Sequence, residues 1–105
     1  MKIFLFCVTA TALAMWACTL QAADKSAGAT LYADACAQCH GPSGKGMASF
    51  PSLSGRDADY ITSRLETYRA REKVGSNSFL MIPNATDLSD DDIANLAAYI
   101  ADNAE

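Results

Sequence analysis

The chain has 105 residues, of which 8 are basic and 12 acidic, and its formal net charge is −4. This length is that of one small domain. An acidic balance argues against nucleic acid or anionic membranes as partners, because both would repel such a surface.

The first 22 residues have the pattern of an export leader. Lys2 provides a positive start, an uncharged apolar run follows from Ile3 to Ala17, and Ala22 is a small residue suited to signal peptidase. We therefore expect a signal peptide over 1–22, a mature domain over 23–105 and a periplasmic protein. The apolar run is short and no second one follows it, so stable membrane insertion is not expected.

Removal of this leader would reduce the number of cysteines in the mature domain. Cys7 and Cys18 leave with it, so only Cys36 and Cys39 remain and a disulfide framework is excluded. The alternative is a lipoprotein with lipid on Cys18, although the bulk of Trp16 suits that motif poorly. Loss of Lys2 makes the domain more acidic, which favours steering toward a basic patch on a partner protein.

Three helical patterns follow, and no segment alternates like a half-buried strand, so we expect an all-α domain. The first pattern runs from about Ser26 to Gln38. Its expected apolar face consists of Ala27, Leu31 and Ala35, with Tyr32 beside them. Gly28 costs this helix roughly 1 kcal/mol relative to alanine, which indicates a close contact with another helix.

The sequence Cys36-Ala37-Gln38-Cys39-His40 is the C-x-x-C-H pattern of covalent haem attachment. Two thiols one turn apart can reach the two vinyl groups of a porphyrin, and the histidine that follows can bind the iron. Zinc would need four ligands, and no second ligand pair is present. A redox dithiol would require neighbouring strands, which the sequence lacks.

A loop rich in glycine and proline leaves the motif at Gly41–Gly46 and continues through Phe50–Arg56. The second helix is expected to start at Asp57 or Asp59 and to end at Arg71. Its buried residues are predicted to be Ile61, Leu65 and Tyr68, with Tyr60 near its start. Its outer, solvated face would hold Arg64, Arg69 and Arg71.

A second irregular region is predicted from Val74 to Asp87, with an apolar patch, Phe79–Ile82, that must bury against something such as a haem face. The last helix starts with a capping box, in which Ser89 is the N-cap and Asp92 its partner. Asp90 and Asp91 suit the helix dipole. The buried stripe is expected to consist of Ile93, Leu96, Ala97 and Ile100, with Tyr99 beside it.

The axial ligands of the iron follow by elimination. His40 is the only histidine in the chain, so two histidine ligands are impossible. The second ligand is a methionine, a weaker donor such as Lys or Asn, or none. Met47 is the weaker methionine candidate, because it follows His40 closely and leaves little chain to pass around the porphyrin edge. Met81 is separated from His40 by a whole predicted helix and is followed by the stiffening Pro83, so we expect Met81 as the second ligand. Two occupied axial positions indicate an electron carrier rather than an enzyme.

These residues together resemble the class I c-type cytochromes, in particular the small acidic bacterial type related to one half of the two-haem cytochromes. The resemblance covers residues 26–102. Its motifs are Gly28 and Tyr32, Cys36–Gly41, Phe50–Arg56, Tyr60, Leu65, Tyr68-Arg69, Met81, Leu88–Ile93 and Leu96–Ala101. It implies the class I cytochrome c fold, with three main helices around one covalently bound haem c.

The resemblance also implies roles for residues outside the motif. The Pro51 carbonyl would accept a hydrogen bond from the His40 ring. Arg56 or Arg71 would lie near the haem propionates. Gly28 and Tyr32 would pack against Leu96 and Tyr99 where the terminal helices cross. The chain departs from the family at Ala70-Arg71, where a glycine is common, and this puts the end of the second helix and the Arg71 contact in question.

The expected function is therefore a monomeric periplasmic electron shuttle that meets redox partner proteins through an exposed haem edge. One alternative is a haem subunit bound permanently to an oxidoreductase. Another is a gas or redox sensor with a labile sixth ligand. The sequence does not identify the electron donor, the acceptor or the reduction potential.

Overall fold

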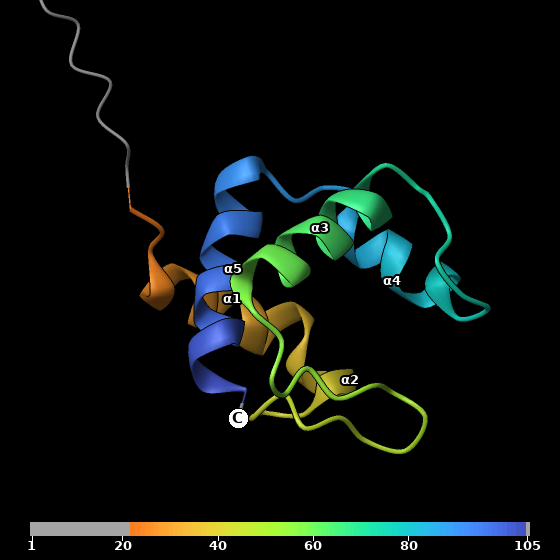
Figure 1. Cartoon of the computed structure of the whole chain (residues 1–105), viewed down its shortest axis with the longest axis horizontal. Coiled ribbons are helices and arrows are strands. Elements are labelled where there is room, and N and C mark those ends of the chain that lie inside the picture. The colour runs from red at the N-terminus through yellow and green to blue at the C-terminus, as the bar shows by residue number, and fades with distance from the viewer. Residues whose placement is uncertain (1–21, 105) are drawn as a thin grey trace, which may run out of the picture.

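The computed structural model describes residues 22–104, and these form an all-α domain, as predicted (Figure 1). The helices are α1 Lys25–Ala35, α2 Ala37–His40, α3 Ala58–Arg69, α4 Ser78–Ala85 and α5 Asp90–Asn103. No β-strand occurs among these residues, and none of their helices is long and apolar enough to cross a membrane. Residues 1–21, which hold all of the predicted leader except Ala22 and include Cys18, lie outside the described residues.

The terminal helices α1 and α5 cross in close contact, and Gly28 makes this possible. A Cβ added at Gly28 would lie 2.1 Å from the Asn95 carbonyl oxygen. The rings of Tyr32 and Tyr99 pack in a tilted arrangement beside it, with centroids 5.4 Å apart. The predicted role of Gly28 is therefore confirmed. The expected apolar face is wrong for Ala27 and Ala35, which are exposed, while Leu31 packs against the core. The approach to α5 buries Gly28 and Tyr32.

The haem motif forms a helix of its own. The prediction that the first helix extends to Gln38 is therefore wrong. Cys36 caps the end of α1 through its N–H, which donates to the Tyr32 carbonyl. Its own carbonyl then accepts hydrogen bonds from the N–H groups of Cys39 and His40. The backbone of Cys36 is therefore the joint between two helices, and both thiols lie on one short turn.

Helices α3 and α5 begin at the predicted caps. The Asp57 carboxylate accepts from the Tyr60 N–H at 2.8 Å, and Ser89 and Asp92 form a complete capping box. Arg69 joins the end of α3 to α5 through an ion pair with Asp90 at 2.7 Å. The predicted stripe of α5 is buried and consists of Ile93, Leu96, Ala97 and Ile100.

The predicted irregular region contains a helix, α4, so this part of the prediction is wrong. Pro83 lies inside α4, although a proline disfavours the helical conformation of the residue before it. Side chains stabilise the end of this helix: the Asn84 amide donates to the Leu80 carbonyl at 2.9 Å, and the Thr86 hydroxyl to the Ile82 carbonyl at 2.7 Å. Met81 is therefore held on a helix rather than on a loop.

The contact at Gly28 gives a stability prediction. Gly28→Ala would force the backbones of α1 and α5 apart, and overpacking of this kind costs about 1–3 kcal/mol. We expect this loss in the free energy of unfolding measured by urea denaturation of the haem-loaded protein. Gly75→Ala is the control, because a Cβ there meets no atom within 4 Å. A Gly28→Ala variant as stable as the control would contradict the packing described.

Candidate functional site

A cavity opens between the motif, the loop after it and helices α3, α4 and α5. It has a larger part of about 380 Å³ and a smaller part of about 130 Å³. The larger part alone falls within the roughly 300–1,000 Å³ of typical cofactor pockets. Both parts are lined by Cys36, His40, Pro51, Leu65, Tyr68, Met81 and Leu96. These shared walls make the two parts one site.

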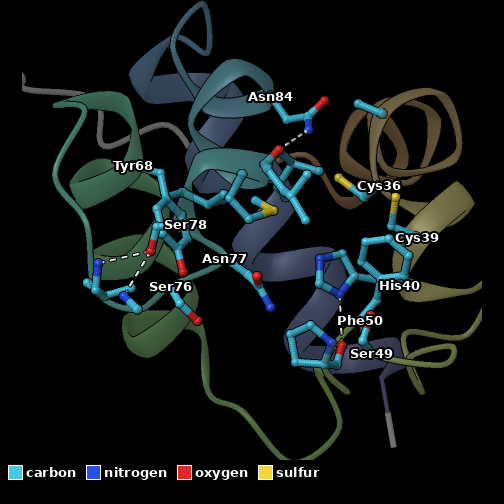
Figure 2. A pocket seen from close by; sticks show the side chains of 18 of the residues that line it. Cys36, Cys39, His40, Ser49, Phe50, Tyr68, Ser76, Asn77, Ser78 and Asn84 are labelled. Carbon is cyan, nitrogen blue, oxygen red and sulfur yellow. Dashed lines mark hydrogen bonds between the residues drawn. The ribbon is translucent and has the colours of Figure 1, made fainter.

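The two thiols lie along one side of the cavity, next to the His40 ring (Figure 2). Burial, and to a smaller extent the neighbouring Cys39, raises the pKa of Cys36 to about 11. Before haem attachment, Cys36 is therefore a neutral thiol at physiological pH. Both cysteines are unbridged. Among residues 22–104, no group of three or more His, Cys, Asp or Glu side chains is placed to hold a metal ion.

The ring of His40 is buried, with 7% of its surface exposed, and it is fixed in orientation. Its Nδ1 lies 2.8 Å from the Pro51 carbonyl oxygen. Because a carbonyl can only accept, Nδ1 carries a proton and donates, so in the neutral ring the lone pair is on Nε2. A neutral imidazole with a free Nε2 lone pair is the form that binds a metal.

The loop between α2 and α3 is built to bring Pro51 to this ring. The Gly46 N–H donates to the His40 carbonyl at 2.7 Å, and the Leu53 N–H donates to the Gly44 carbonyl at 2.7 Å. Gly46 has φ +82°, and a Cβ there would lie 2.6 Å from the Phe50 carbonyl oxygen. The glycines of the loop thus allow it to fold tightly back on His40.

The two methionines are placed very differently. Met81, on α4, is half-buried and lines both parts of the cavity. Met47 lies in the loop after α2, is 46% exposed and lines neither part. Helices α2 and α4 lie apart in the fold (Figure 1), so His40 and Met81 reach the cavity from different elements.

The arginines separate into three environments, and the single solvated face predicted for Arg64, Arg69 and Arg71 is wrong for two of them. Arg69 pairs with Asp90. Arg64 is half-buried and lines the smaller part of the cavity together with Arg56. Arg71 is exposed and lines neither part. The sequence prediction missed Arg64, although its position one helical turn from both Tyr60 and Tyr68 was visible.

Residues 26–104 match the protein-family model described as Cytochrome c. The chain belongs to the cytochrome c family. Cytochrome c-554(547) of Halothiobacillus neapolitanus is 39% identical over 88 residues, which are 76% of this chain and 97% of that protein. Cytochrome c-554(548) of Halomonas halodenitrificans is 46% identical over 65 residues, which are 61% and 78% of the two chains.

Solved structures agree with this assignment. Reduced recombinant cytochrome c4 from Pseudomonas stutzeri has a TM-score of 0.66 and 32% identity, covering 76% of this chain and 50% of that chain. The cytochrome c4 of Acidithiobacillus ferrooxidans has the same TM-score at 25% identity, covering 80% of this chain and 52% of that one. The chain thus spans about half the length of these cytochromes and has the class I all-α cytochrome fold.

Family membership identifies the cofactor as one haem c, bound covalently through Cys36 and Cys39. The residues present fit this group. The cavity has the size of a cofactor pocket, and both cysteines line its larger part. It also contains the His40 imidazole, fixed by Pro51, and the Met81 thioether. The walls between these groups are largely apolar, with Leu65 and Leu96 from α3 and α5.

The end of α3 gives a prediction about Arg71. Its φ of +64° places it in the left-handed region, where a side chain is strained and glycine is not. Arg71→Gly is expected to raise the free energy of unfolding by about 1 kcal/mol, because it relieves this strain. Denaturant titration of the haem-loaded protein measures the change. Ala70→Gly, with φ −75° at the neighbouring position, is the control and should give no gain. A destabilised Arg71→Gly protein would contradict this account.

Proposed function

We propose that this cytochrome is a periplasmic electron-transfer protein whose haem iron has His40 and Met81 as axial ligands. The observation that best supports the proposal is that these two side chains line the same two-part cavity from separate helices, beside the two attachment thiols. Met47, the only other methionine after the predicted leader, lines neither part of the cavity.

The haem iron supplies the redox chemistry, by taking up and releasing one electron. The protein residues set the conditions for it. Pro51 holds the His40 ring in one tautomer and one orientation. A thioether ligand from Met81 favours a higher potential than more basic ligands would. With His40 and Met81 both bound to the iron, substrate and oxygen would find no open coordination site.

The surface near the cavity suits brief contact with another protein. Val74 and Leu80 line the larger part of the cavity, and they are 46% and 45% exposed. Apolar side chains of this kind at a cofactor edge favour docking, while the net negative charge of the chain steers it toward a basic partner surface. We therefore propose that the protein is a monomer and that it exchanges electrons with redox partner proteins.

One relative supports the proposal that this cytochrome accepts electrons from a dehydrogenase. A protein of Stutzerimonas stutzeri named thiosulfate dehydrogenase electron acceptor is 39% identical over 67 residues, which are 63% of this chain and 31% of that protein. An electron acceptor of this kind needs no catalytic residue of its own. The predicted export leader agrees with a periplasmic location, where such a carrier would be free to diffuse between partners.

The Met81→Ala variant tests the proposed ligand set. Loss of the thioether should remove the sulfur-to-iron charge-transfer band of the oxidised protein and lower the reduction potential by on the order of 0.1 V, within the roughly 0.8 V that axial ligands can span. Visible spectra and redox titration measure both effects. Met47→Ala is the matched control and should change neither. An unchanged band in Met81→Ala would contradict the assignment of Met81 as a ligand.

A further inference from the structure

Two arginines and one tyrosine form a polar corner in the smaller part of the cavity. The guanidinium carbon of Arg56 lies 4.4 Å from the centre of the Tyr60 ring, and that of Arg64 lies 5.3 Å from it. All three residues line this part of the cavity, together with His40 and Met81. Stacking on one aromatic ring holds both cations near the same space.

Neither cation is neutralised by a carboxylate in the described part of the chain. The ion pairs there join Lys25 to Asp102 and Arg69 to Asp90. Asp57, the residue next to Arg56, caps α3 by accepting a hydrogen bond from the Tyr60 N–H. A half-buried arginine without a partner favours an anion at the cavity wall, because burial weakens its contact with water.

The position of Arg64 on α3 separates it from the other arginines of this helix. It is one helical turn after Tyr60 and one before Tyr68, and all three line the smaller part of the cavity. Arg69 is directed to Asp90 on α5 instead. Arg71 follows the end of the helix and lines no part of the cavity. Arg64 is therefore the cation that α3 contributes to this space.

We propose that Arg64 acts with Arg56 as a positioning residue for the acid side chains of the haem, and that its charge raises the reduction potential. The inference rests on the proposed function. A guanidinium beside a carboxylate offsets its negative charge. Without Arg64 that charge would be left uncompensated near the iron, where it stabilises the oxidised, more positive state. Tyr60 holds both guanidinium groups by stacking.

Redox titration of the haem-loaded Arg64→Gln variant tests this inference. The potential should fall in Arg64→Gln, and Arg64→Lys should recover most of the wild-type value because it keeps the charge. Arg71→Gln removes the same charge from the exposed end of α3 and should leave the potential nearly unchanged. Tyr60→Leu should lower the potential, whereas Tyr60→Phe, which keeps the ring, should not.

Two results would overturn the inference. One is an equal shift of the reduction potential in Arg64→Gln and Arg71→Gln, and the other is a fall of the potential in Arg64→Lys as large as that in Arg64→Gln. The visible spectrum of each protein is recorded first. A wild-type protein without the sulfur-to-iron band would refute the proposed ligand set. An intact band with no shift in Arg64→Gln would refute only the role of Arg64.

Discussion

The close crossing of α1 and α5 at Gly28 is the constraint on which the rest of the structure depends. The absence of a side chain there lets the backbone of α1 meet the Asn95 carbonyl. Because α1 leads directly into the motif at Cys36, this crossing also fixes the two thiols and His40 relative to α5. Leu96, one residue after Asn95, then lies on the wall of the cavity. The contact between α1 and α5 thus positions the haem site.

The hydrophobic core and the cavity share their side chains. Leu65, Leu96 and Ile100 belong to the buried core, and each also lines the cavity. A domain of this size buries a limited apolar area by itself, and a bound cofactor adds to it. We expect the haem to complete this core, so that attachment at Cys36 and Cys39 contributes to folding as well as to function.

The features that a short motif or a single telling residue marks could be predicted, including the helix contact at Gly28, whereas α4 and the environment of Arg64 could not. The motif at Cys36–His40 and the caps at Asp57 and Ser89 depend on neighbouring residues, and the structure contains all of them. The sequence did not predict α4, because Pro83 indicates the end of a helix. The Asn84 and Thr86 side chains stabilise the helix despite this proline, by donating hydrogen bonds to its carbonyl groups. Arg64 was assigned to solvent because its environment is a cavity formed by segments far apart in the sequence.

The central claim is that protein side chains fill both axial positions of the iron, which distinguishes a carrier from a sensor or an enzyme. Exposure of the reduced protein to carbon monoxide at neutral pH tests it most directly, since the gas binds only where a position is open or its ligand is labile. The account predicts a visible spectrum unchanged by carbon monoxide. Rapid formation of a carbon monoxide complex by the wild-type protein would contradict it and would favour a sensor.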